Sequence, residues 1–197
     1  MKKSYKFAII GATTAAMSLS FGMDKVTTAA LKEVPAIKKI AQSPLVIKAI
    51  TTSNRASTAI HGKALSSLEA QWRTQLHAGK GPLLTKTMQN PLAQSLKTTI
   101  SNSSGAYLGA IVMNNKGLNV AQTIYSKNYS QQKHVIWQRT YKVGSGAIYI
   151  SRSRFNKHLG KRMVVIAVPV LNQKKQPIGA FAMDVNFTGL GVKEAKW

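Results

Sequence analysis

The sequence predicts an α+β protein in which helices come first and an antiparallel sheet follows. Through residues 31–104 the apolar side chains recur at three- and four-residue intervals, which is typical of amphipathic helices. From residue 106 the pattern changes to short apolar runs divided by turns rich in Asn, Gly and Lys, which is typical of strands. A helical half followed by a strand-rich half indicates a single α+β domain.

The helical region carries clear start and stop signals. Ser43 before Pro44 predicts a helix start, because Ser is a frequent N-cap and Pro is favoured at the first helical position. A second start is expected at Asn90-Pro91, after a stop at residues 79–82. Between these points a stripe of apolar residues repeats every four positions: Ile60, Ala64, Leu68, Trp72 and Leu76. We therefore interpret Trp72 as a core residue.

Five strands are expected in the second half, at residues 106–113, 118–123, 146–150, 162–171 and 178–187. Residues 114–117 predict the turn between the first two strands, since Asn and Gly tolerate the backbone angles of tight turns. Residues 172–176 predict the loop of a closing hairpin. A longer segment, residues 124–145, separates the second and third strands and is rich in Tyr, Trp, Lys, Arg and Gln. The sheet region is taken as residues 105–190, with a tail at 191–197.

Residues 1–30 have the pattern of a secretory signal peptide. Lys2, Lys3 and Lys6 precede an uncharged stretch at residues 7–21, and small residues that suit a cleavage site follow. We expect the mature chain to begin between residues 19 and 31 and to be periplasmic or secreted. The alternative is an uncleaved membrane anchor, which is less favoured because a spanning helix needs about 20 mostly apolar residues.

The charge balance excludes several kinds of chemistry. The chain has 28 Lys and Arg against 5 Asp and Glu, a net charge of +23, and without residues 1–30 the counts are 24 and 4, or +20. No carboxylate occurs between Glu69 and Asp184. That stretch therefore lacks the paired acids of glycoside hydrolysis and the oxygen ligands of calcium or magnesium sites.

Other reactive groups are also scarce. There is no cysteine, which excludes disulfides, thiolate metal sites and cysteine nucleophiles. The histidines, at positions 61, 77, 134 and 158, do not have metal-ligand spacing. We expect a protein that is not an enzyme and that needs no metal and no cofactor.

Five segments, in order, resemble the extracytoplasmic PAS-like sensor domains known as PDC or Cache domains, over about residues 40–187. They are the helical pieces 43–50 and 71–73, the strand-turn-strand 112–123, the pair Asn128-Tyr129 with Trp137-Gln138, and the final hairpin at residues 168–170 and 176–180. The resemblance implies a long N-terminal helix packed on a five-stranded antiparallel PAS-like sheet. It also implies a small-molecule pocket between the sheet and the long connecting segment.

Family members that sit in membranes use this pocket to control signalling modules. Here only residues 188–197 follow the sheet, so we expect a standalone form that feeds a separate membrane receptor. The sequence departs from the family in charge, because Lys127, Lys133 and His134 stand where we would expect acidic residues. The arginine-tryptophan-tyrosine pattern of amino-acid-binding relatives is not evident, and no amino-acid ligand is assigned.

The candidate ligand-binding residues combine aromatic walls with cationic donors: Tyr129, Trp137, Arg139, Tyr141, Tyr149, Arg152 and Asp184. Aromatic rings supply contact area, and Arg can hold a carboxylate or phosphate through two hydrogen bonds. This mixture favours an anionic or zwitterionic ligand. The resemblance implies that Asp184, on the last strand, meets a ligand amine. The alternatives are that the aromatic residues belong to the core, that the arginines are solvated, and that Asp184 pairs with a neighbouring cation.

A second hypothesis is a basic interaction protein that binds an anionic polymer or a membrane surface. Residues 152–162 hold five of the Lys and Arg side chains and form a credible patch. No nucleic-acid-binding motif accompanies the patch, so specific nucleic-acid recognition is not expected.

Overall fold

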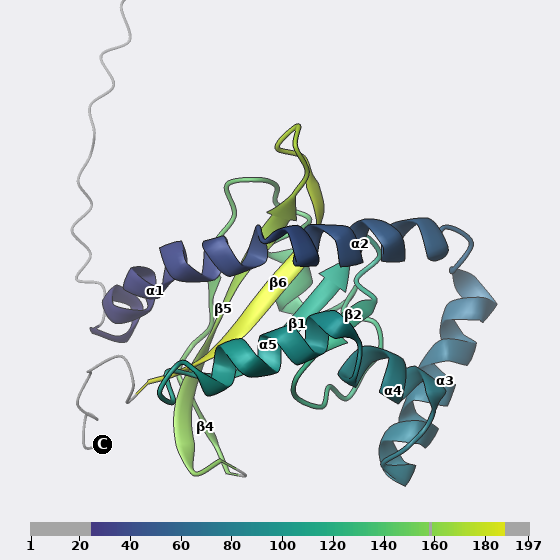
Figure 1. Ribbon diagram of the computed structural model, residues 1–197, viewed down its shortest axis with the longest axis horizontal. Coiled ribbons are helices and arrows are strands. Elements are labelled where there is room, and N and C mark those ends of the chain that lie inside the picture. Colours follow the sequence, from purple (N-terminus) through teal and green to yellow (C-terminus); the bar gives the residue numbers. More distant parts are fainter. Residues whose placement is uncertain (1–24, 158, 188–197) are drawn as a thin grey trace, which may run out of the picture.

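Figure 1 shows the computed structural model of the protein, which describes residues 25–157 and 159–187. Most of the expected signal segment and the whole expected tail therefore lie outside the described residues. Residues 25–30, at the end of the expected signal, belong to the first helix, and Ala30 is fully buried there. No helix among the described residues is both long enough and apolar enough to cross a membrane.

The sheet has six strands, and all of their pairings are antiparallel (Figure 1). The order across the sheet is β2-β1-β6-β5-β3, and β4 pairs with β5 beside β3. The strands are β1 (Tyr107–Asn114), β2 (Asn119–Gln122), β3 (Tyr149–Ile150), β4 (Arg154–Asn156), β5 (Lys161–Leu171) and β6 (Pro177–Asn186). The two longest strands, β5 and β6, form the closing hairpin that the polar loop at residues 172–176 predicts.

Five helices precede the sheet and one short helix interrupts the connection from β2 to β3. They are α1 (Lys25–Ala41), α2 (Pro44–Ala56), α3 (Gly62–Ala78), α4 (Pro82–Met88), α5 (Pro91–Ser101) and α6 (Val135–Gln138). The long N-terminal helix is thus two helices in succession along one side of the sheet (Figure 1). The break falls before Pro44 because a proline disfavours helical geometry in the preceding residue, and Ser43 accordingly has an extended ψ of 146°.

One face of the sheet packs against α1, α2 and α5. In β5 the residues at every second position, Val164 to Val170, face these helices, as do Phe181, Met183 and Val185 of β6. The period of two in a strand makes this possible, since alternate side chains point to opposite faces. The helices contribute the other half of the core, with Ile37, Val46, Ile50 and Leu96 almost fully buried.

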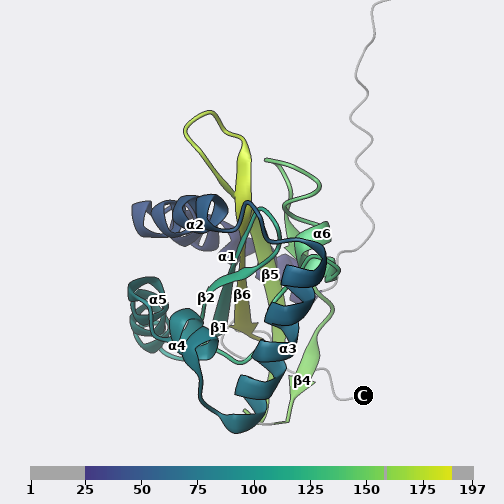
Figure 2. The same ribbon diagram turned by 90° about the vertical axis from the view of Figure 1, so that its right-hand side faces the viewer.

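The opposite face of the sheet is covered by the connection from β2 to β3. Figure 2 views the molecule from the side, with α2, α4 and α5 on one side of the strands and α6 on the other. The residues of β5 and β6 that face α6 are small: Ala167, Ala180 and Ala182, with Val165 beside them. α3 packs separately through Trp72, which is fully buried against Leu84, Leu118 and Tyr129.

The predicted fold class is confirmed: helices precede an antiparallel sheet, and the N-terminal helical rod packs on it. The expected number of strands was one too few, because β4 was not predicted. Its three residues, Arg154 to Asn156, lie at the edge of the sheet and include exposed positions, so they lack the apolar alternation by which a strand is recognised. The interpretation of Trp72 as a core residue is also confirmed.

Candidate ligand-binding site

A cavity of about 800 Å³ lies on the α6 side of the sheet. Its floor is formed by residues of three central strands, namely Ile111, Val165, Ala182 and Asp184. One wall is the start of the connection, residues 124–128, with Gln131 and residues 134–136 beyond it. The facing wall is formed by Tyr149 to Arg152 and by Arg154. This volume lies within the range of small-molecule sites in proteins.

The sheet leaves room for the cavity because its residues are small at this point. Ala182, on the floor, pairs with Ile111 on one side and with Ala167 on the other, and Ala167 belongs to the cluster around Trp137. Gly109, which pairs with Asp184, lies under the side chain of Ile124. A Cβ atom on Gly109 would stand 2.5 Å from Cγ2 of Ile124. Glycine is therefore required here for the cavity wall to rest against β1.

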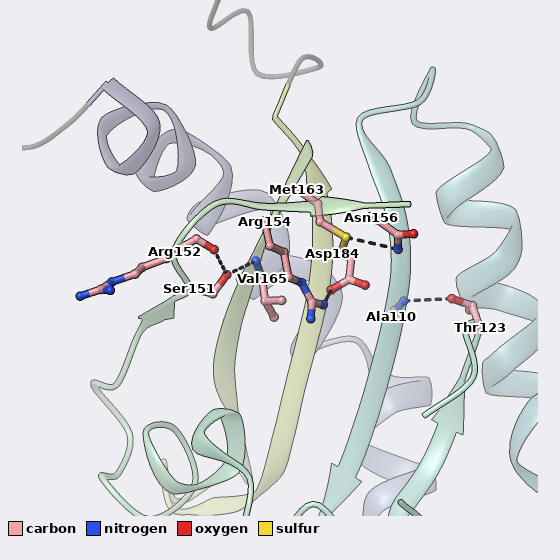
Figure 3. Close-up of polar contacts among 9 residues, drawn as sticks. All are labelled: Ala110, Thr123, Ser151, Arg152, Arg154, Asn156, Met163, Val165 and Asp184. Carbon is pink, nitrogen blue, oxygen red and sulfur yellow. Dashed lines mark hydrogen bonds and ion pairs between the residues drawn. The ribbon is translucent and has the colours of Figure 1, made fainter. Parts of the chain in front are cut away.

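Asp184 is the acidic group of the cavity, and Arg154 is its partner. A guanidinium nitrogen of Arg154 lies 3.8 Å from Oδ1 of Asp184, with the Asp184 side chain 10% exposed and that of Arg154 61% exposed. Figure 3 shows Arg154 reaching from β4 across β5 toward the carboxylate. Burial raises the pKa of Asp184 from 3.8 to about 6, although Arg154 acts in the opposite direction. The carboxylate is thus held in an environment that opposes its ionisation.

Two further cations and a histidine line the cavity. In Figure 3 the side chain of Arg152 extends away from Asp184, so its guanidinium lies apart from the Arg154–Asp184 pair. Lys127 and His134 contribute from the connection. The pKa of His134 is lowered by burial and by the charge of Arg154, which favours the neutral imidazole. Cations therefore outnumber the single carboxylate, and the local potential is positive.

Ser151 fixes the segment that carries Arg152 and joins β3 to β4, the strand of Arg154. Its hydroxyl accepts a hydrogen bond from the backbone N–H of Val165 at 2.8 Å and donates one to the carbonyl of Arg152 at 2.9 Å (Figure 3). The backbone N–H of Ser151 also donates to the carbonyl of Val165. These bonds join β3 to β4 along the same edge of β5, so Tyr149 and Arg154 are held on one wall.

The wall formed by the connection is held from α3. Glu69 accepts hydrogen bonds from the backbone N–H groups of Tyr129 (3.2 Å) and Ser130 (2.5 Å). The indole N–H of Trp72 donates to the carbonyl of Ser126 at 2.9 Å. Trp72 and Glu69 therefore set the position of a loop more than 50 residues away in sequence.

The structure brings three of the seven candidate residues to the cavity: Tyr149, Arg152 and Asp184. Arg139 instead lines a neighbouring recess of about 390 Å³, where Tyr149 is also found. Tyr129 is buried in the α3 cluster beside Trp72, at a ring-centroid distance of 5.7 Å. These two residues do not line the larger cavity, although Tyr129 helps to hold its wall.

Trp137 and Tyr141 lie beneath the cavity wall rather than on its surface. Their rings stack at a centroid distance of 4.9 Å, and the indole N–H of Trp137 donates to the carbonyl of Asn114 at 3.1 Å. Trp137 is 2% exposed and packs against Met113 and the alanines of the sheet. These contacts give both rings a supporting role for α6.

Sequence reasoning assigned Arg154 to a surface patch and not to the site. Its role depends on β4, which turns Arg154 and Asp184 to the same face of the sheet. Lys127 and His134 were noted only as departures from the family pattern, and Ser151 carried no signal of its own.

Among the described residues, no group of three or more His, Cys, Asp or Glu side chains could hold a metal ion. The arrangement is suited to bind a small charged molecule through its cations and one carboxylate.

No family model matches this chain, and a search of curated proteins finds no match. Among solved structures, the chain is similar to the ligand-binding domain of the Pseudomonas aeruginosa PAO1 amino acid chemoreceptor PctC in complex with GABA. The TM-score is 0.41 at 11% identity, covering 72% of this chain and 63% of that one. It is also similar to the sensory domain of the Campylobacter jejuni chemoreceptor Tlp3 with isoleucine bound, with a TM-score of 0.39 at 14% identity over 86% of this chain and 66% of that one.

A third similar structure is the sensor domain of the V. cholerae histidine kinase DctB, with a TM-score of 0.35 at 13% identity over 83% of this chain and 58% of that one. This chain spans slightly less than two thirds of the length of the two chemoreceptor domains. The solved structures that it resembles are thus ligand-binding domains of chemoreceptors and the sensor domain of a histidine kinase.

Proposed function

We propose that this protein is a sensor-type domain that binds a small charged molecule in the cavity above Asp184. The observation that carries the proposal is the cavity itself, which is lined by a buried carboxylate, two arginines and a lysine beside an apolar floor. A buried ionised group with a single ion-pair partner lowers stability, and carboxylates with a raised pKa cluster at functional sites. The function is binding rather than catalysis.

The charge of the cavity favours an anionic ligand. Arg154 already offsets Asp184, which leaves Arg152 and Lys127 to meet a carboxylate or phosphate. A zwitterion is the second choice, because Asp184 can accept hydrogen bonds from an amine while a guanidinium holds the acid. Tyr149 adds an aromatic wall for the body of either ligand.

The proposal is tested by a thermal-shift screen of small carboxylates, phosphates, amines and amino acids, followed by calorimetric titration of the compounds that raise the melting temperature. We expect Arg152→Ala to weaken the best anion about ten- to a hundredfold, as the loss of a charge-assisted contact does. Arg154→Ala should give a smaller loss, because Arg154 is already paired with Asp184. Arg139→Ala is the matched control, because it removes the same charge from the neighbouring recess.

If no compound in the screen stabilises the protein, the proposed function fails. It also fails if a ligand is found whose affinity is the same in the wild type and in the Arg154→Ala and Arg152→Ala variants. A crystal structure of the complex would place the ligand directly.

We further propose that the protein is exported and that a separate membrane receptor reads its ligand-bound state. The export proposal rests on the basic and apolar pattern of residues 1–30. Cleavage ahead of α1 would preserve the helix, whose Ala30 and Val34 are in the core. Mass spectrometry of the protein recovered from the periplasm or medium tests this, and a full-length chain retained in the membrane fraction would contradict it.

The basic surface supports a second candidate function, binding to an anionic polymer or membrane surface. Lys157 and Lys161 are exposed in the β4–β5 hairpin, together with Phe155, which is 53% exposed. Binding of this kind weakens steeply as salt rises, whereas capture in a buried cavity is screened much less. A salt titration of each interaction therefore separates the two functions.

A further inference from the structure

A second hollow lies on the other side of the sheet, between α2 and the α4–α5 pair. Its volume is about 450 Å³, and its floor is the edge of the sheet at Leu118 to Val120. One wall is a single face of α2, where Leu45, Ala49 and Ala56 recur at helical spacing. The opposite wall runs from Lys86 to Leu92, and the far end is closed by Ile60 and Tyr129. We call this hollow the α2–α4 groove.

The polar side chains that line the walls of the α2–α4 groove are mostly engaged within the protein. Asn90 accepts from the N–H of Ala93 at 2.9 Å and donates to the carbonyl of Val120 at 2.9 Å. The hydroxyl of Thr87 donates to the carbonyl of Leu83 at 3.0 Å. Ser53 and Ser57 both accept from the side-chain amide of Asn114. Asn90, Ser53 and Ser57 hold the helices to the sheet, and the Thr87 bond lies within α4, so the groove presents a largely apolar surface to a ligand.

The ionic groups at the α2–α4 groove are two lysines on opposite walls. Lys48 projects from α2 and Lys86 from α4, and both are exposed. Within the described part of the chain neither lysine's ammonium group has an ion-pair or hydrogen-bond partner, and no acidic residue lines the groove. An occupant that matches this surface has an apolar body and one negative charge.

We propose that the α2–α4 groove is a second binding site, and that its ligand is a carboxylate with an unbranched alkyl chain. The alkyl chain lies between α2 and α5 on Leu118 and Val120, and the carboxylate lies between Lys48 and Lys86. The site is independent of the cavity above Asp184, because the two hollows share no lining residue. It therefore goes beyond the proposed sensor function.

The test is calorimetric titration of the protein with octanoate, decanoate and decyltrimethylammonium, each below its micelle concentration. Each buried methylene contributes about 0.8 kcal/mol, so two added carbons should raise the affinity by about tenfold from octanoate to decanoate. Decyltrimethylammonium carries an alkyl chain one carbon longer than that of decanoate and the opposite charge, and it should bind at least tenfold more weakly than decanoate. We expect one molecule of decanoate to bind per protein molecule.

Variants locate the site. Ala49→Trp fills the groove from α2 and should abolish decanoate binding, and Leu45→Trp does the same from a more exposed position if Ala49→Trp disturbs folding. Replacing Lys48 and Lys86 together by Gln should weaken decanoate about three- to tenfold, as expected for exposed ion pairs. The matched control replaces Lys32 and Lys63, which are exposed on α1 and α3 outside the groove, and should leave the affinity unchanged.

Several outcomes would overturn the proposal: no decanoate binding, binding of many molecules per chain, equal affinity for the cationic amphiphile, or full affinity in folded Ala49→Trp and Leu45→Trp variants. Arg154→Ala distinguishes this site from the cavity above Asp184. If decanoate affinity falls in Arg154→Ala and not in the groove variants, the ligand occupies that cavity and the groove proposal is wrong, while the proposed function stands.

Discussion

Replacing Asp184 with Asn should make the folded protein more stable at neutral pH. The carboxylate is 10% exposed and meets one guanidinium at 3.8 Å, so its charge is poorly compensated. Its pKa in the folded protein is about 6, against an ordinary value of 3.8. In the pH interval between these values the folded state binds more protons than the unfolded state, so the free energy of unfolding falls as pH rises.

The size of the effect follows from the two pKa values. They differ by about two pH units, and each unit is worth about 1.4 kcal/mol, so the ionised carboxylate lowers the free energy of unfolding by about 3 kcal/mol above pH 6. Asn has nearly the same shape and no charge. Because the amide must also be buried, we expect Asp184→Asn to gain about 2 kcal/mol at pH 7.5. The loss of the Arg154 pair offsets little, since Arg154 is 61% exposed.

The assay is urea denaturation followed by circular dichroism at half-unit steps from pH 4 to pH 8. The difference between variant and wild type should be small at pH 4 and should grow to its full value by about pH 7. Glu33→Gln is the matched control: Glu33 is half-buried and accepts a hydrogen bond from Tyr107 at 3.0 Å, so its replacement should not stabilise the protein. A variant that is less stable than wild type at pH 7.5, or a difference that does not change with pH, would refute the reasoning.

Three further predictions concern the frame of the site. Gly179→Ala should lower the free energy of unfolding by about 2–3 kcal/mol, because the new Cβ would lie 2.2 Å from the carbonyl oxygen of Met113. Gly146→Ala is the control: there is open space around Gly146, so the free energy of unfolding in the same urea titration should not change. Trp72→Ala should lower the free energy of unfolding by about 3–5 kcal/mol in the same titration. Trp72→Phe keeps a ring but loses the hydrogen bond to the carbonyl of Ser126, so it should lower the free energy of unfolding clearly less. Equal losses in the two variants would contradict the structure. Glu69→Gln should speed amide hydrogen exchange at Tyr129 and Ser130 while leaving the β5–β6 hairpin unchanged, and exchange that is unaffected at those two amides would show that the carboxylate does not hold the loop.

Local patterns in the sequence were sufficient for the fold class and for most of the elements. Alternating Val and Ile at positions 164–170 predict a strand with one buried face, and the structure places that face on the helices. Ser43-Pro44 marks the break between α1 and α2, because proline constrains the residue before it whatever the tertiary context. The four-residue stripe through Trp72 similarly indicates the buried face of α3. Each of these signals depends on neighbours only a few residues away.

The composition of the site depended on contacts that are distant in sequence. Arg154 becomes the partner of Asp184 only because β4 adds to the edge of β5, and a three-residue edge strand has almost no pattern of its own. Trp137, by contrast, looks like a ligand-binding aromatic in sequence, but it packs beneath the wall where the alanines of β5 and β6 leave space for its ring. The sequence indicated which chemical groups were available. The packing of strands and helices decided which of these groups reach the cavity, because the pairing of a strand sets the direction of its side chains.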